Sequence, residues 1–379
     1  SALETLASKA DLPGEASYYV RLYGHHYLGE DESALSVQRD ASVPASSMSE
    51  HVRARSMMRS RGIAAGVHAF HQAYCSPQAV AELWPTQDVG RYWHGQRELP
   101  RQLTIRGFSS GFGDFIQWVR YARALKALGT EIGWDVQFDG LSGDCRINDH
   151  DHQLARQLTS ADFVVGHNDA HMWTTPFTLF TSLFPVLGYG STGRYIEPSS
   201  DPEVARILSE IRKRAQGRRC IGIFWSSCES NNLYAHRSLH QEHLAPLWEA
   251  SDDIHWVVMQ RGYQGVSWAD GPYSKDPGRC TVLPAQTSLA QVIGLIDQLD
   301  GFIGNDGVLT HAAGALNKPG YLLLNARCTD WRYEQCVDTT PWYPSLNVLR
   351  PDTMGDWGTL IFKLVSSVKS VSSQPRWSD

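Results

Sequence analysis

The chain has 379 residues and 42% of them are hydrophobic, so we expect a globular protein with two domains and an appendage rather than a single core. The formal net charge of −6 argues against a nucleic-acid-binding body, and no apolar run approaches the length of an integral membrane segment. The seven Cys residues are odd in number and unclustered, and the start lacks a signal-peptide pattern, so we expect a cytoplasmic protein.

The first hundred residues differ in pattern from the rest. Aromatic residues crowd 18–28, which predicts a hairpin or short strand, and the polar, Ser-rich stretch 31–49 predicts a loop. Residues 49–74 have helical spacing with many Arg and His, which predicts one or two helices. We expect residues 1–100 to form a mixed helical and irregular appendage that binds the acceptor or mediates homo-oligomerisation.

From residue 101 strands and helices alternate, which predicts an α/β unit over 101–217. The expected elements are a strand at 103–108, a glycine turn at 109–113, an amphipathic helix at 114–128, strands at 132–138 and 162–166, an apolar segment of uncertain type at 177–187, and a charged helix at 201–216.

A second α/β unit is predicted over 218–350. Its expected elements are a strand at 220–225, a helix near 241–250, strands at 254–259 and 280–283, a helix at 288–298, and strands at 299–303 and 321–324. A helix is predicted within 351–370, and we expect it to pack back on the first α/β unit. We expect residues 371–379 to be a frayed tail.

The most informative stretch is 304–316, which follows the apolar strand 299–303 and opens an Ala-rich helix. A strand, a tight polar turn and a helix start form a ready anion site, because free amides and the positive end of the helix dipole converge there. Two doubly wound units would also place a ligand crevice between the carboxyl ends of their strands. We therefore expect a bound phosphate or diphosphate.

Several short motifs follow one another along the chain in an order that is informative about its family. They are Ser-Ser-Gly-Phe-Gly-Asp114 with the helix 116–121, Trp225 to Ser227 followed by Arg237-Ser238, Asp306 to His311 followed by Ala-Gly-Ala-Leu-x-Lys-Pro319, Asp330-Trp331-Arg332, and Pro341-Trp342-Tyr343-Pro344-Ser345. Together they resemble the heptosyltransferase-like (glycosyltransferase family 9-like) enzymes, most closely the subgroup often fused to tetratricopeptide repeats. The resemblance covers roughly residues 90–365.

The resemblance implies a GT-B architecture, in which two Rossmann-like domains face a cleft without a bound metal. The domain over 218–350 would hold a nucleotide-diphospho-sugar, and the domain over 101–217 would hold the acceptor and a catalytic carboxylate. The family inverts at the anomeric carbon by direct displacement.

Asp114 is the candidate catalytic base, since it follows a glycine turn at a helix start, where the backbone can approach a ligand closely. The alternative is that Asp114 only caps the helix or complements its dipole. The resemblance favours the catalytic role.

The leaving diphosphate must be stabilised by hydrogen-bond donors and by positive charge. We expect the amides of Gly307, Val308 and Leu309, the side chains of Thr310 and His311, the guanidinium of Arg237, and Ser226 and Ser227 to supply them. Gly307 stands where the family usually has Thr or Ser, which removes one hydroxyl. The alternatives are a buried helix histidine at His311, a solvated arginine at Arg237, plain turn residues at Ser226 and Ser227, and a turn-capping role for Asp306.

Other positions are inferred from their place after strands. We expect nucleoside contacts from Gln260, Arg261, Pro284 and Gln286, and acceptor-side contacts from Ser109, Ser110, Gly111, Gly113, His167 and His171. Each of these could instead be a structural polar or turn residue.

The sequence gives little support for a metal site. The Asp149–His152 stretch has an Asp-x-Asp spacing, but it lies in a polar segment with no strand immediately before it, so we interpret it as a loop. Cys328 and Cys336 have no second pair at ligand spacing, which argues against zinc.

The leading hypothesis is a metal-independent, inverting glycosyltransferase without a cofactor. Its donor would be a nucleotide-diphospho-sugar, with ADP-heptose favoured and UDP- or GDP-sugars open, and its acceptor a protein or glycan. The alternatives are a nucleotide-sugar epimerase or hydrolase on the same frame, and a non-catalytic nucleotide-sugar or glycan-binding module.

Overall fold

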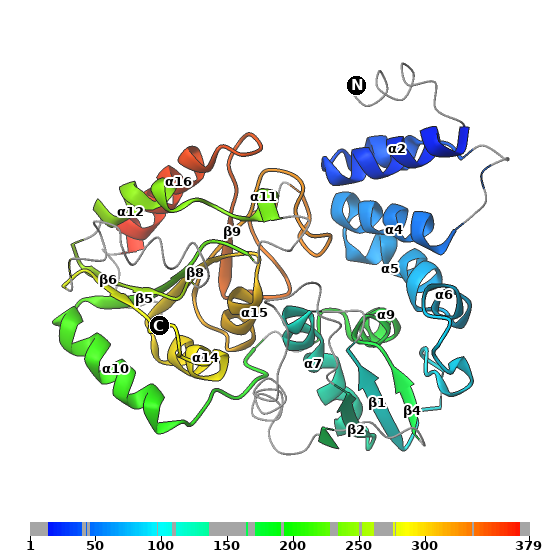
Figure 1. Cartoon of the computed structure of the whole chain (residues 1–379), viewed down its shortest axis with the longest axis horizontal. Coiled ribbons are helices and arrows are strands. Elements are labelled where there is room, and N and C mark those ends of the chain that lie inside the picture. The colour runs from blue at the N-terminus through cyan, green and yellow to red at the C-terminus, as the bar shows by residue number, and fades with distance from the viewer. Residues whose placement is uncertain are drawn as a thin grey trace.

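Two parallel β-sheets and a group of N-terminal helices make up the fold (Figure 1). The computed structural model describes residues 14–39, 43, 46–96, 98–107, 111–135, 164–165, 171–190, 193–227, 234–249, 252–260, 276, 278–335 and 337–371. The predicted α/β class with two parallel sheets is confirmed. Among these residues, no helix combines the length and the apolar character needed to cross a membrane.

The first sheet is parallel, with the strand order β3-β2-β1-β4. Its elements are β1 (Gln102–Arg106), α7 (Phe112–Ala127), β2 (Glu131–Asp135), β3 (Val164–Val165), β4 (Met172–Thr174) and α9 (Pro176–Leu187). Helix α7 carries the chain back between the parallel strands β1 and β2. The apolar segment of uncertain type is α9, which begins with Pro176 after a Thr175 side-chain cap.

The second sheet is also parallel, with the strand order β10-β9-β8-β5-β6-β7. Its strands are β5 (Arg219–Phe224), β6 (Ile254–Val258), β7 (Cys280–Val282), β8 (Gly301–Asn305), β9 (Gly320–Leu323) and β10 (Leu346–Leu349). Strands β6, β8 and β9 are buried along their whole length, as helices on both faces of a parallel sheet require.

Helices cover both faces of the second sheet (Figure 1). One face carries α10 (Pro202–Ala215), α14 (Leu289–Gln298) and α15 (Val308–Ala315), and the other carries η3 (Gln241–Leu244), α12 (Ala245–Glu249) and α16 (Trp357–Val371). The expectation that the C-terminal helix packs on the first α/β unit is wrong. Its apolar stripe packs on the second sheet, in a cluster of Trp357, Leu360, Ile361, Leu364, Ile221, Trp256 and Tyr321.

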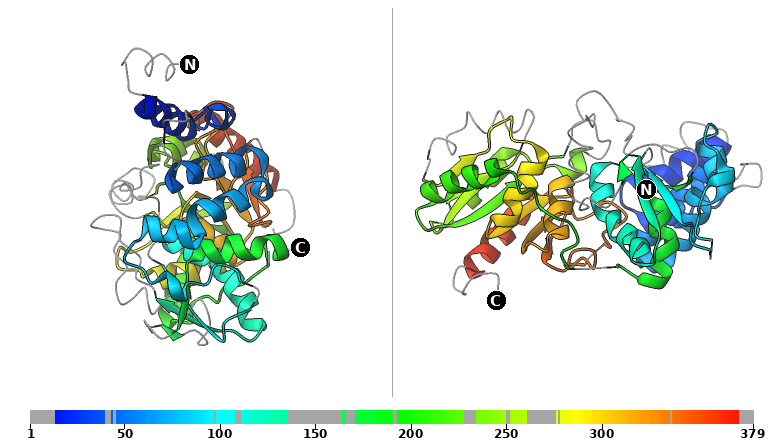
Figure 2. Two further views of the ribbon diagram at one scale, coloured as in Figure 1. Left: turned by 90° about the vertical axis from the view of Figure 1, so that its right-hand side faces the viewer. Right: turned by 90° about the horizontal axis from the view of Figure 1, so that it is seen from below.

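The N-terminal region is helical in its described part. It contains α2 (Gly14–Tyr27), α3 (Asp31–Ser36), α4 (Ser47–Arg61), α5 (Ile63–Phe70), the π-helical turn η1 (His71–Cys75), α6 (Pro77–Leu83) and the short turn η2 (Val89–Arg91). Figure 2 shows these helices at the opposite end of the molecule from α10 and α14.

Two of the N-terminal predictions are wrong. The aromatic stretch 18–28 is not a hairpin, since α2 runs through it, and the stretch 31–49 contains α3 and the start of α4. The aromatic residues of α2 recur at helical spacing, so Tyr19, Tyr23 and Tyr27 form a row of contacting rings along one face.

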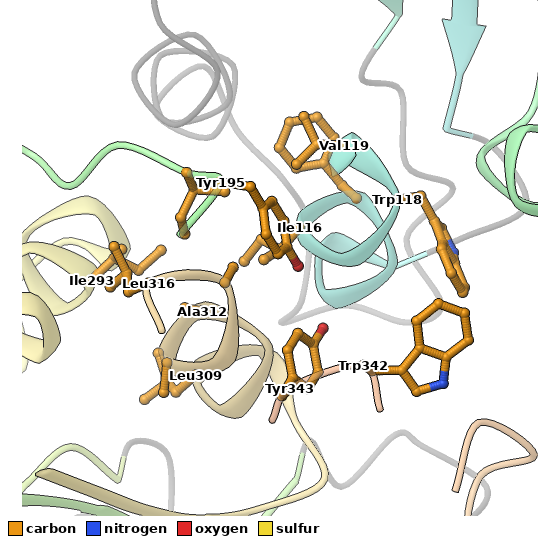
Figure 3. Close-up of a cluster of buried hydrophobic side chains, with 14 of the residues drawn as sticks. Ile116, Trp118, Val119, Tyr195, Ile293, Leu309, Ala312, Leu316, Trp342 and Tyr343 are labelled. Atoms are coloured by element: carbon orange, nitrogen blue, oxygen red, sulfur yellow. The ribbon is translucent and has the colours of Figure 1, made fainter. Parts of the chain in front are cut away.

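The two α/β units share one hydrophobic core (Figure 3). Ile116 of α7 faces Ala312 of α15, Tyr343 lies beside the two helices, and Trp342 packs against Trp118 of α7. A side chain at Gly314 would overlap the Tyr343 ring, which is why α15 has a glycine at this approach. The junction between the units is therefore a packed interface.

Candidate functional site

The turn after β8 lies at the centre of the site. Gly307 is the N-cap of α15, and the first helical hydrogen bonds go from the Thr310 and His311 amides to its carbonyl. The amides of Gly307, Val308 and Leu309 therefore have no acceptor within the helix. A Cβ at Gly307 would lie 2.7 Å from Cε1 of Phe224, so the position has no room for the Thr or Ser of the resembled family.

The two polar side chains of α15 have different environments. The Thr310 hydroxyl donates to the carbonyl of Asn305 at 2.6 Å, so a phosphate would have to compete with this carbonyl for its proton. His311 Nδ1 lies 2.7 Å from the Tyr343 hydroxyl, and its Nε2 lies 3.8 Å from Asp306 Oδ1. Burial lowers the pKa of His311 to about 4, so the ring is neutral at pH 7.

Arg237, at the end of α11 (Tyr234–Arg237), faces this turn. Its guanidinium lies 3.3 Å from Asp306 Oδ2 and 3.1 Å from Asp330 Oδ2. Burial opposes the charge of Arg237, but Asp306 and Asp330 outweigh it and raise its pKa. Burial raises the pKa of Asp306 to about 6, while the charge of Arg237 works in the other direction. Arg237 thus lies at the turn and pairs with two carboxylates, so it is not a solvated loop arginine, and its contact with a diphosphate stays a prediction.

Asp114 is both a helix cap and a member of the ion-pair network. Its Oδ2 accepts a hydrogen bond from the Gly111 amide at 2.8 Å, and its Oδ1 pairs with Arg332. Arg332 Nη1 lies 3.0 Å from Asp330 Oδ1. An alternating chain of charges therefore connects the two α/β units, and it runs Asp114–Arg332–Asp330–Arg237–Asp306.

The turn after β5 is held in place by hydrogen bonds from a side chain of the neighbouring strand end. Gln260 Oε1 accepts from the amides of Trp225 and Ser226, and its Nε2 donates to the Ser226 carbonyl. Gln260 therefore holds the turn after β5, and the nucleoside contact expected of it stays a prediction. Ser227 lies closer to the site, and its hydroxyl donates to the Asp306 carbonyl at 3.2 Å.

Other predicted residues lie outside the ion-pair chain. Pro284 and Gln286 are exposed in the turn after the edge strand β7, and His171 directly precedes β4. Gly113 lies against His311, where a Cβ would be 2.7 Å from the imidazole Cδ2. Four predicted site residues and the Asp-x-Asp stretch fall outside the described part of the chain: Ser109, Ser110, His167, Arg261 and 149–152.

Sequence reasoning gave no role to Asp330, Arg332, Tyr333 or Tyr343, although three of them belong to quoted motifs. Asp330 bridges Arg237 and Arg332, and the Tyr333 hydroxyl lies 3.4 Å from Asp306 Oδ1. Burial lowers the pKa of Arg332 to about 10, which leaves it charged at pH 7. The Asp-Trp-Arg motif was the available signal for Asp330 and Arg332.

The N-terminal helices hold the loop that carries Asp330 and Arg332. Arg59 of α4 makes a buried double contact with Asp31 and donates to the Thr329 carbonyl at 2.8 Å. Trp331 packs its ring 5.3 Å from that of Phe70 at the end of α5. The N-terminal appendage therefore contributes to the geometry of the site.

The match to a protein-family model falls on this region. Residues 273–323 match the model of Glycosyltransferase family 9 (heptosyltransferase), and no curated protein matches the chain. Among solved structures, the chain is similar to a glycosyl transferase family 9 protein from Veillonella parvula DSM 2008, with 10% identity over 74% of this chain and 99% of that chain and a TM-score of 0.47.

It is also similar to E. coli ADP-heptose lps heptosyltransferase II, with 14% identity over 71% of this chain and 98% of that chain and a TM-score of 0.46. The iron-containing dodecameric glycosyltransferase TibC from enterotoxigenic E. coli H10407 is 13% identical over 73% of this chain and 78% of that chain, with a TM-score of 0.44. The match to the glycosyltransferase family 9 (heptosyltransferase) model thus covers the strand, turn and helix that carry Asp306 and His311.

Proposed function

We propose that the chain is a glycosyltransferase of GT-B architecture that moves a sugar from a nucleotide-diphospho-sugar to a protein or glycan hydroxyl by inverting, metal-independent displacement. A heptose is the favoured sugar and ADP-heptose the favoured donor, with UDP- and GDP-sugars as the alternatives. The observation that supports this best is the start of α15, within the segment that the family 9 model matches, beside the half-buried guanidinium of Arg237.

The donor diphosphate would bind at the amides of Gly307, Val308 and Leu309 and beside Arg237. Backbone amides at a helix start and a guanidinium are the groups that bind phosphate oxygens best in proteins. A diphosphate would compete with Asp306 and Asp330 for Arg237. Its negative charge would raise the pKa of Asp306 above about 6, so that this carboxyl becomes neutral beside the phosphate.

Asp114 would act as the base. The acceptor oxygen attacks the anomeric carbon as the bond from that carbon to the diphosphate oxygen breaks, and Asp114 takes the hydroxyl proton. The Gly111 amide and Arg332 both stabilise the ionised carboxylate, so Asp114 is a weak base. We therefore expect proton transfer late in the step, when the attacking oxygen carries positive charge.

The experiment that tests this proposal is thermal unfolding against ADP-, GDP-, UDP-, CDP- and dTDP-sugars and their free diphosphates, with and without EDTA. A ligand that binds the folded state raises the melting temperature by mass action. We expect one nucleotide class to give a shift that EDTA does not change and that Arg237→Ala abolishes. No shift with any of these nucleotides would refute the proposal.

A further inference from the structure

Arg55 of α4 is a half-buried cation without a counter-ion, and its Nε atom is fully buried. Its Nε has no hydrogen-bond partner, and no ion pair or hydrogen bond joins its guanidinium to any other residue in the described part of the chain. Burial lowers the pKa of Arg55, and the charge of Asp330 acts against this from beyond bonding distance. Such a group destabilises a folded protein unless a ligand compensates its charge.

The neighbouring arginines differ from Arg55 in this respect. Arg59, one turn later on α4, pairs with Asp31, and Arg332 pairs with Asp114 and Asp330. The carboxylates near Arg55 are therefore already bound to other cations. What this part of the molecule lacks is one negative group.

His51 lies one turn before Arg55 and on the same face of α4. It is 8% exposed, its Nδ1 is buried without a hydrogen-bond partner, and its ring stacks on Tyr74 at 4.4 Å. The charge of Arg55 contributes to lowering the pKa of His51, after burial, so the two groups act on each other. A neutral imidazole with an unused nitrogen and an unpaired guanidinium together form a hydrogen-bonding site for an anion.

We propose that His51 and Arg55 bind an anionic group of the acceptor, a phosphate or a carboxylate, between α4 and the loop 329–333. This assignment rests on the proposed glycosyltransferase function. We assign the bound anionic group to the acceptor rather than to the donor because Arg55 acts electrostatically on Arg332, and Arg332 is the partner of the candidate base Asp114. The candidate donor diphosphate position, in contrast, is at Arg237 and the start of α15.

The test is thermal unfolding of the full chain with inorganic phosphate or with succinate, in the wild type, in Arg55→Met and in Arg61→Met. Arg61 is on the same helix but exposed and paired with Glu32, so its variant removes one charge outside the site. We expect the wild type and Arg61→Met to be stabilised, and the apparent anion affinity to fall about tenfold or more in Arg55→Met. The anion that stabilises more identifies the group on the acceptor.

The ligand-free proteins provide a second readout. Replacing an unpaired, half-buried cation by an apolar side chain of similar length is expected to raise the melting temperature, whereas loss of a structural arginine lowers it. Equal anion stabilisation of Arg55→Met and wild type would overturn the proposal, as would a lower melting temperature of ligand-free Arg55→Met.

Nucleoside diphosphates separate this inference from the function on which it rests. Their stabilising effect should persist in Arg55→Met and disappear in Arg237→Ala. If Arg55→Met also loses that effect, Arg55 belongs to the donor site and the assignment to the acceptor is wrong. If no nucleotide stabilises the wild type but phosphate does so through Arg55, the proposed function fails while the anion site remains.

Discussion

Arg332 pairs with Asp114, although the two residues are 218 positions apart in the chain and belong to different α/β units. Arg332 also contacts Asp330, which in turn contacts Arg237. The candidate base of the first unit is thus linked through charges to the candidate diphosphate site of the second unit. Changes at either end are expected to affect both binding and chemistry.

Asp114→Asn is expected to lower sugar transfer about 10²–10⁴-fold while donor binding persists. The Asn side chain can still accept the Gly111 hydrogen bond but cannot take a proton from an acceptor hydroxyl. Single-turnover transfer and the donor-induced melting shift measure the two effects separately. Asp201→Asn is the control, since Asp201 also accepts a backbone hydrogen bond at a helix start, as the N-cap residue of α10, but lies outside the ion-pair chain. Full transfer activity in Asp114→Asn would show that Asp114 is not the base, whereas donor binding without transfer in the wild type would favour a binding module over an enzyme.

Arg332→Met is expected to destabilise the fold by about 3–5 kcal/mol, because it leaves Asp114 without a cation in a mostly buried place and leaves Asp330 with Arg237 alone. Urea unfolding measures the change. Arg206→Met removes an exposed ion pair with Glu203 and should change the free energy of unfolding by less than about 1 kcal/mol. A result for Arg332→Met as small as that for Arg206→Met would mean that the ion pair with Asp114 contributes little.

Much of the fold follows from local patterns in the sequence. The helix over 201–216 was predicted within one residue of α10 (Pro202–Ala215) because its apolar stripe, acidic start and basic end agree. The short strands β4 and β10 were missed, since three or four residues carry no periodic signal, and pairing in the sheet defines them. The surface on which α16 packs was mispredicted for a related reason, because an apolar stripe on a helix does not determine which surface the helix covers.

The site was predictable only where local structure determines it. The turn at 304–307 and the capping position of Asp114 follow from a strand, a glycine turn and a helix start. The pairing of Arg332 with Asp114 depends on tertiary packing and has no local pattern. Gln260 shows a second limit, because a polar residue after a strand suggests a ligand contact, while its role in bracing the neighbouring turn depends on tertiary packing.

Asp306 and His311 should make opposite contributions to the pH dependence of stability. The folded-state pKa of Asp306 is raised from 3.8 to about 6, so its protonated form stabilises the fold and that contribution is lost as the pH rises from about 4 to 6. The folded-state pKa of His311 is lowered from 6.5 to about 4, so its contribution is lost as the pH falls through the same range. The two contributions largely cancel in the wild type.

Single substitutions should reveal how each residue changes the slope of the free energy of unfolding against pH. In Asp306→Asn, the free energy of unfolding should rise more steeply between pH 4 and 6 than in the wild type, because only the His311 contribution remains. In His311→Gln it should rise less steeply or fall. Urea unfolding across this pH range measures both slopes, and parallel curves for all three proteins would show that neither group titrates with a shifted pKa.

Gly307→Ala is expected to destabilise the fold by about 1–3 kcal/mol through overpacking, because the new Cβ would lie 2.7 Å from the Phe224 ring. The backbone itself tolerates alanine, since φ at Gly307 is −167° and therefore extended. A smaller neighbour should relieve the clash, so the loss on adding Gly307→Ala to Phe224→Leu should be smaller than in the wild type. A double-mutant cycle in urea measures this coupling. Additive effects would mean that the ring does not exclude a side chain here, and the absence of the resembled family's hydroxyl would then need another physical cause.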